Sequence, residues 1–127
     1  MKPRMRAILI GLALAIAATL TQVMPSIGQD ASPKKNAFDQ CAVCHSTDGS
    51  NGTGPTLKGV FGRQSGTAAG FRYSRAMRNA GITWDEKSLD QYLSNPQEFI
   101  AGNVMPFSGV ADPGEREAII VFLRSLK

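Results

Sequence analysis

The residues of this chain best suited to chemistry stand together at Cys41, Cys44 and His45, in the pattern Cys-x-x-Cys-His. On a helix, positions i, i+3 and i+4 project from one face, so both thiols and the imidazole point the same way. Two thiols so placed can form thioether bonds to one porphyrin edge while the imidazole reaches the iron. The spacing therefore predicts one haem c, attached through Cys41 and Cys44, with His45 as an iron ligand.

Two cysteines at this spacing also occur in thioredoxin-like redox pairs, in halves of zinc sites and in structural disulfides. A thioredoxin-like pair belongs to a βαβ context, whereas the residues before Cys41 have a helical pattern. A zinc site needs two more soft ligands, but the chain has only two cysteines and one histidine. Haem attachment is the interpretation that best fits this composition.

Residues 1–28 have the composition of a secretory signal peptide. Basic residues precede an apolar run from Ala7 to Leu20, and the small residues of Ser26-Ile27-Gly28 suit a cleavage site. An uncleaved membrane anchor is the alternative, although the run is shorter than the ~20 residues that span a bilayer comfortably. Because c-type haem is attached outside the cytoplasm, export agrees with the motif at Cys41. We expect residues 29–127 to form a single periplasmic domain.

Removal of this leader changes the charge of the chain. The full sequence has 14 Lys+Arg and 10 Asp+Glu, a formal net charge of +4 at pH 7. Three of the basic residues and none of the acidic ones precede residue 29, which leaves 11 − 10 = +1. A nearly neutral domain gives no indication of binding to nucleic acid or to a membrane surface.

The local signals predict helices joined by loops, with no convincing strand pattern. A first helix is expected from Ser32-Pro33 to about Cys44, and a short one from Ser74 to Asn79. A capping box at Thr83–Glu86 predicts a helix that Asn95-Pro96 ends. A second box at Asp112–Glu115 predicts the terminal helix. The fold class should be all-α.

The stretch from residue 46 to residue 70 is rich in Gly, Ser and Thr and has no sustained periodicity. A loop of this length in a compact domain is usually organised by something other than protein, and haem fits that role. The apolar residues expected on inward helix faces are Ala37, Phe38, Leu89, Tyr92, Leu93, Ile119, Phe122, Leu123 and Leu126.

Since histidine occurs once, the second axial position of the iron falls to a methionine. Outside the leader only Met77 and Met105 remain. Met77 has charged neighbours, whereas Met105 lies in the helix-free stretch Gly102–Phe107, which Gly and Pro shape. A thioether ligand must be carried over the far face of the haem by a loop, and this favours Met105 as the ligand. The alternative role for Met105 is to fill space in the core.

Further motifs extend over the whole of residues 29–127. Besides Cys41-x-x-Cys44-His45 they are Thr53-Gly54-Pro55, Gly59-Val60-Phe61-Gly62-Arg63, Gly70-Phe71-Arg72-Tyr73-Ser74, Gly81-Ile82-Thr83-Trp84, Tyr92-Leu93-x-Asn95-Pro96 and Gly102-x-x-Met105-x-Phe107. In order and spacing they resemble the class I c-type cytochromes, in the branch of mitochondrial cytochrome c and bacterial cytochromes c2 and c550. The resemblance implies the cytochrome c fold, with several helices and long loops wrapped around one covalently attached haem.

The resemblance also implies roles for residues around the haem. The Pro55 carbonyl is expected to accept a hydrogen bond from His45, which fixes the orientation of the ring. Arg63, Tyr73 and Trp84 match positions that hydrogen-bond or neutralise a buried propionate. The remaining matches are Tyr92 to an aromatic near the methionine sulfur, Asn103 to a hydroxyl that bonds the opposite propionate, and Phe107 to an aromatic at the exposed haem edge.

The chain also departs from the family pattern. Met77 stands where mitochondrial members have an asparagine of the propionate and water network, and a glycine usual in the first helix has no counterpart. The lysines that surround the haem edge in mitochondrial members are largely absent, and their positions hold Gln40, Gln97, Glu98 and Val104. We therefore expect association with partners to depend only weakly on ionic strength.

The function that the resemblance implies is one-electron transfer by a monomer. With both axial positions filled, the iron has no open site, which argues against an enzyme. Expected partners are redox donors and acceptors such as a cytochrome bc1-type complex, a terminal oxidase, a reaction centre or a dehydrogenase. Two alternatives are a dedicated electron-acceptor subunit of one periplasmic dehydrogenase and, with an open sixth site, a small haem peroxidase.

Overall fold

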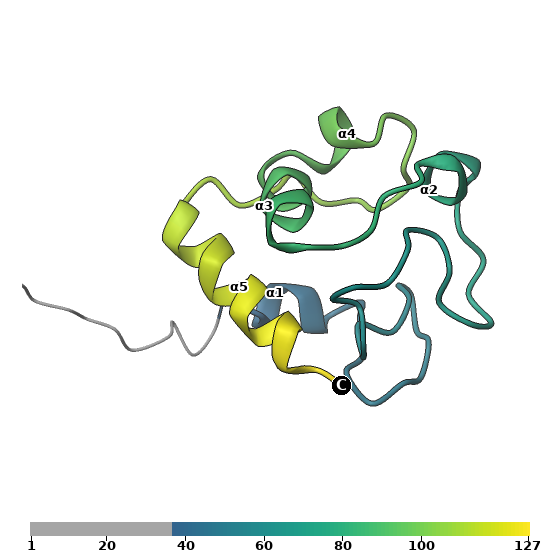
Figure 1. Ribbon diagram of the computed structural model, residues 1–127, viewed down its shortest axis with the longest axis horizontal. Helices are drawn as coiled ribbons and strands as arrows, with labels where there is room; N and C mark the ends of the chain where they lie inside the picture. The colour runs from purple at the N-terminus through teal and green to yellow at the C-terminus, as the bar shows by residue number, and fades with distance from the viewer. Residues whose placement is uncertain (1–36) are drawn as a thin grey trace, which may run out of the picture. The chain divides into compact units, whose positions relative to one another are not determined.

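The computed structural model describes residues 37–127 (Figure 1). The expected signal peptide and the expected helix start at Ser32-Pro33 lie outside the described residues. The elements in chain order are α1 (Asp39–Ala42), α2 (Arg75–Asn79), α3 (Glu86–Ser94), α4 (Pro96–Phe99) and α5 (Pro113–Ser125).

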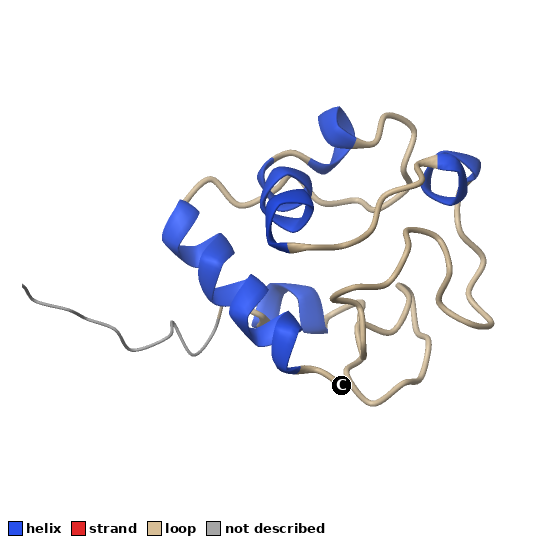
Figure 2. Cartoon of the chain, viewed as in Figure 1, coloured by secondary structure: helices blue, strands red, loops and turns tan. Residues whose placement is uncertain are grey.

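Loops connect these helices, and the described residues contain no strand (Figure 2). Extended backbone pairs there only at an isolated antiparallel bridge between Gln64 and Thr83. The predicted all-α class is confirmed. In the described part of the chain, no helix is both long and apolar enough to cross a membrane.

Helix α1 is shorter than predicted, because it begins at Asp39 and is assigned only as far as Ala42. The backbone nevertheless keeps helical hydrogen bonds through the cysteine motif. The N–H groups of Cys44 and His45 donate to the Cys41 carbonyl at 3.1 and 2.9 Å. The turn that brings the two thiols and the imidazole to one face is therefore present.

Helix α3 begins two residues later than the predicted box at Thr83–Glu86, so that prediction is wrong. Asp85 is the N-cap: its carboxylate accepts the Ser88 N–H at 2.7 Å, and the Ser88 hydroxyl accepts the Asp85 N–H at 2.8 Å. The hydrogen bond from the Ser88 N–H to the carboxylate is the main cause that lowers the pKa of Asp85. Asp85 and Ser88 form the same reciprocal arrangement as the expected pair, while Thr83 is held in the bridge to Gln64.

Asn95 ends α3 as predicted, and it also begins a helix that the sequence analysis did not predict. Its side chain accepts the Glu98 N–H at 3.3 Å, and Pro96 occupies the first position of α4. An Asn-Pro pair is both a stop signal for one helix and a start signal for the next. The pair therefore places the short helix α4 directly after α3.

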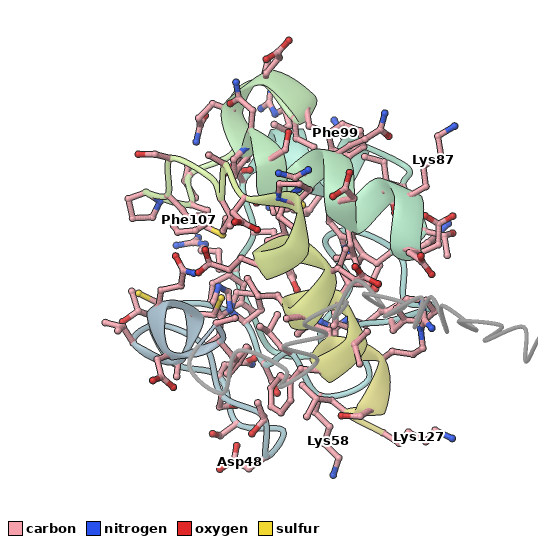
Figure 3. All side chains as sticks on the ribbon, turned by 90° about the vertical axis from the view of Figure 1, so that its left-hand side faces the viewer. Asp48, Lys58, Lys87, Phe99, Phe107 and Lys127 are labelled. Carbon is pink, nitrogen blue, oxygen red and sulfur yellow. The ribbon has the colours of Figure 1, made fainter. Side chains whose placement is uncertain are left out.

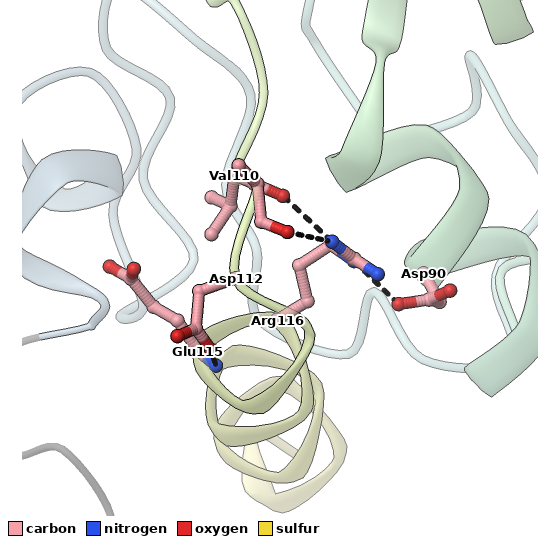
Figure 4. A network of polar contacts seen from close by, with 6 residues as sticks. Asp90, Val110, Asp112, Glu115 and Arg116 are labelled. Carbon is pink, nitrogen blue, oxygen red and sulfur yellow. Dashed lines mark hydrogen bonds and ion pairs between the residues drawn. The ribbon is translucent and has the colours of Figure 1, made fainter.

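Helix α5 begins as predicted, with Asp112 accepting the Glu115 N–H at 2.8 Å and Pro113 at the first position. Figure 4 shows the polar contacts by which Arg116 holds the N-terminal end of α5 in place. Its guanidinium contacts Asp90 of α3 at 2.6 Å and donates to the carbonyls of Val110 and Ala111 at 2.9 and 3.0 Å.

The core lies mainly between α3 and α5, which pack against each other, and the loops around them. Phe38, the N-cap of α1, contacts Phe122 of α5 with ring centroids 4.6 Å apart. On α5, Ile119 is only 1% exposed, whereas Val121 is 54% exposed.

We predict that Ile119→Ala lowers the free energy of unfolding by about 2–5 kcal/mol, because it removes buried apolar volume from a site that cannot collapse fully. Val121→Ala on the same helix should change it by less than about 0.5 kcal/mol. Denaturant unfolding of both variants measures the difference. Equal effects would contradict the packing of α5 described above.

Candidate functional site

A cavity of about 770 Å³ opens between α1, the loop that follows it and the loop that precedes α5. Its size is within the range of cofactor and ligand sites, roughly 300–1,000 Å³, and its lining is mostly apolar. Every site residue singled out from the sequence lines it: Cys41, Cys44, His45, Pro55, Arg63, Tyr73, Trp84, Tyr92, Asn103, Met105 and Phe107. In Figure 3 the loop that carries Phe107 lies above α1 on the same side of the domain.

His45 is held by the segment ten residues further along the chain. Its Nδ1 lies 2.7 Å from the Pro55 carbonyl oxygen, so Nδ1 carries the proton and donates it, which leaves Nε2 with a free lone pair. Gly54 is buried against the ring, because a Cβ there would lie only 2.5 Å from Cε1 of His45. Only glycine lets this backbone approach the imidazole so closely.

Cys41 and Cys44 are free thiols on the wall of the same cavity. Burial, together with the negative charge of Glu115, raises the pKa of Cys41 to about 11. A thioredoxin-like redox cysteine needs the opposite shift, because its reactive form is the thiolate. The electrostatics of Cys41 therefore disfavour the redox-pair alternative.

Met105 reaches the cavity from the loop between α4 and α5. The Tyr92 hydroxyl lies 3.6 Å from Sδ of Met105 and donates to it. Burial raises the pKa of Tyr92 to about 12, so the phenol keeps the proton that it donates. A thioether sulfur has two lone pairs, so this contact leaves one of them free.

Polar groups on the cavity wall are only partly used by the protein. Arg63 donates to the carbonyls of Thr56 and Lys58, both at 2.9 Å, and forms no ion pair among the described residues. The indole N–H of Trp84 forms no hydrogen bond within residues 37–127, and because no fully buried side-chain N or O atom there lacks a partner, it must border the cavity that Trp84 lines. Tyr73 accepts the Ala68 N–H at 3.2 Å and makes no other side-chain hydrogen bond there. The cavity wall therefore has one positive charge without an ion-pair partner, that of Arg63, and hydrogen-bond donors on Trp84 and Tyr73 that the described residues do not use.

Asn103 differs from the role that the resemblance implied. Both of its amide protons are directed at protein carbonyls, those of Pro96 at 2.7 Å and Ile100 at 3.1 Å. Its Oδ1 accepts the Met105 N–H at 2.9 Å. No donor of Asn103 is left for a propionate, because its side chain is used to shape the loop.

Several apolar lining residues were predicted as core rather than as site. Leu89, Leu93, Ile119 and Leu123 line the cavity from α3 and α5, and their helical spacing was the signal that placed them inward. Phe71 had no assigned role, and no periodic pattern marks it, because it lies in a loop.

The comparisons with known proteins agree with this site. The family model described as "Cytochrome c" matches residues 33–127. The chain belongs to the cytochrome c family. It is 47% identical over 98 residues to cytochrome c2 iso-2 of Magnetospirillum fulvum, covering 76% of this chain and 99% of that protein. It is 40% identical to cytochrome c2 of Blastochloris viridis, covering 94% and 93%. The solved structure of cytochrome cH from Methylobacterium extorquens superposes with a TM-score of 0.71 at 40% identity, covering 76% and 98%.

Membership in the cytochrome c family confirms the class I resemblance, the fold and the expectation of one covalently bound haem c. It also makes this protein a small electron carrier rather than an enzyme. The cavity fits the cofactor: its wall is apolar, and Arg63 and Trp84 present the charge and the donor that a buried carboxylate needs.

We predict that Gly54→Ala forces the imidazole of His45 away from the position that Pro55 fixes. Overpacking of this kind costs about 1–3 kcal/mol, so the thermal midpoint of the holoprotein should fall and its Soret band should shift. Gly52→Ala in the same loop is the control, because its Cβ would meet only the Cys44 carbonyl at 3.5 Å. Equal melting of the two variants would show that the ring is free to move.

Proposed function

We propose that this cytochrome c is a periplasmic one-electron carrier whose iron is bound by His45 and Met105, with the haem held by thioether bonds to Cys41 and Cys44. The proposal is carried by one observation: the same cavity is lined by two residues, His45 and Met105, that each have a lone pair free to bind iron. Each of the two side chains is held by a hydrogen bond to a second residue, Pro55 for His45 and Tyr92 for Met105.

Bound haem c supplies a centre that takes up and releases one electron. The chain contributes two ligands that stay in place in both oxidation states. A thioether is a soft, weak donor that favours ferrous iron, and an apolar wall disfavours the extra charge of ferric iron. Both effects raise the reduction potential, which suits a carrier that accepts electrons from respiratory or photosynthetic donors.

The polar part of the wall would bind the haem propionates. Arg63 brings a positive charge that no described carboxylate neutralises, and Trp84 and Tyr73 bring N–H and O–H groups. Met77 lines this cavity without adding a donor, in keeping with the departure noted from the sequence. We infer that Arg63, Trp84 and Tyr73 compensate the propionate charge.

Electron exchange would occur at the cavity mouth, with redox proteins as donors and acceptors. Val43 and Val104 line the cavity and are 81% and 73% exposed. Gln40, beside them on the wall, is uncharged. This apolar rim supports docking to partner proteins whose affinity depends little on ionic strength. Such a rim is compatible with a carrier that meets several partners and with the dedicated acceptor subunit of one dehydrogenase.

Export to the periplasm rests on residues 1–28. Since the match to cytochrome c2 of Blastochloris viridis covers 94% of the chain, the similarity must reach into this segment. Similarity to a cytochrome c2 within this segment supports the signal peptide that its composition predicts. Retention of the segment as an anchor is the alternative, and the mass of the mature protein distinguishes the two.

We expect Met105→Ala to abolish the weak far-red absorption band that reports sulfur on ferric iron. The potential should fall by on the order of 100 mV, because the soft ligand is lost, and cyanide should bind readily. Met77→Ala is the matched control and should keep the band. If Met77→Ala loses the band and Met105→Ala keeps it, the ligand assignment is reversed.

Mass spectrometry and pyridine haemochrome spectra of the exported protein test attachment. The wild type should have the mass of residues 29–127 plus one haem, with the haemochrome of two thioethers. Cys44→Ser should give a low yield of protein with a single thioether, because one sulfur no longer bonds the haem. A variant with wild-type yield and two thioethers would exclude Cys44 as an attachment site.

A further inference from the structure

Asn103 is a buried polar side chain in the loop that carries Met105. It is 5% exposed, and its amide group is fully used within the protein. Nδ2 donates to the carbonyls of Pro96 and Ile100, at 2.7 and 3.1 Å, and Oδ1 accepts the Met105 N–H at 2.9 Å. Buried amides with every hydrogen bond satisfied rigidify the segments that they join.

The two segments that Asn103 joins differ in how firmly they are fixed. Pro96 and Ile100 belong to α4 and its end, and α4 packs against α3. Met105 lies in a stretch without regular structure, between Gly102, which has a φ of +86°, and Pro106. Asn103 therefore connects a packed helix to a loop that has no ladder of hydrogen bonds of its own.

The peptide groups on both sides of Met105 are held. The Met105 N–H donates to Oδ1 of Asn103. The Met105 carbonyl accepts from the Phe107 N–H at 2.9 Å and from Nε2 of Gln97 at 3.1 Å. The two fixed peptide groups restrict where the side chain between them can point. The neighbouring Val104 is 73% exposed, whereas Met105 is half-buried on the cavity wall.

We propose that Asn103 is the positioning residue for the sixth iron ligand: it holds the Met105 loop closed over the cavity instead of donating to a propionate. The proposal rests on ligation by Met105. A thioether binds ferric iron weakly, so the fraction bound depends on how far the loop is preorganised. Without Asn103, the buried carbonyls of Pro96 and Ile100 and the N–H of Met105 lose their shared partner.

The test compares Asn103→Ala with Asn51→Ala in the ferric holoprotein. Asn51 is a matched control, because its side chain also joins two backbone segments, donating to the Ala69 carbonyl at 2.9 Å and accepting the Thr56 N–H at 3.0 Å. Both variants should melt at a lower temperature. Only Asn103→Ala should weaken the far-red sulfur band, and only it should bind added imidazole about tenfold faster, the factor expected for lost buried hydrogen bonds.

Asn103→Ser provides a second variant should the alanine variant fail to fold. A serine hydroxyl keeps one donor and one acceptor on a shorter arm, so the sulfur band and imidazole rate should lie between those of wild type and alanine. A sulfur band and imidazole rate unchanged from wild type in whichever of these variants folds would overturn the proposal. Absence of the band in the wild type would instead refute Met105 as ligand, so the two failures are distinguishable.

Discussion

The structure depends on a constraint of volume: although α3 and α5 pack against each other, residues of both helices also line an apolar cavity of about 770 Å³. At ~24 cal/mol per Å³, an empty apolar hollow of this size would cost roughly 18 kcal/mol. That exceeds the whole stability of a typical domain, which is about 5–15 kcal/mol. Bound haem c would therefore be part of the hydrophobic core, and Leu89, Leu93, Ile119 and Leu123, which line the cavity, would pack against it. The same burial that stabilises the fold sets the environment of the iron, which couples folding to the reduction potential.

The two sides of the cavity are held in physically different ways. His45 is fixed locally, since Gly54 and Pro55 lie within ten residues of it and leave its ring no room to turn. Met105 depends instead on hydrogen bonds, which its peptide groups form with Asn103, Phe107 and Gln97 and its sulfur with Tyr92. The His45 side of the cavity is therefore fixed mainly by close packing, and the Met105 side by a small set of hydrogen bonds. Looseness at this centre should begin at Met105, whose proposed bond to iron would also be the weaker of the two.

Much of this site could be predicted because several of its residues lie close together in the sequence, at a spacing that itself indicates their arrangement. Cys41, Cys44 and His45 form one helical turn, and Asp112-Pro113 begins α5 as its caps indicate. The errors arose where two signals compete. Asp85 with Ser88 displaced the box expected at Thr83, and Asn95-Pro96 began a helix as well as ending one. The use of Asn103 could not be predicted, because its partners are backbone carbonyls whose positions exist only once α4 has folded.

The mouth of the cavity bears on how such a carrier finds its partners. Lysines around an exposed haem edge would steer an acidic partner into place and raise the rate of association. Here Val43 and Val104, which line the cavity, are 81% and 73% exposed, and Gln40 beside them is uncharged. An apolar rim contributes by excluding water at contact distance, which affects dissociation more than approach. This cytochrome should therefore gain selectivity from the fit of the two surfaces after encounter, so that the shape of the partner matters more than its charge.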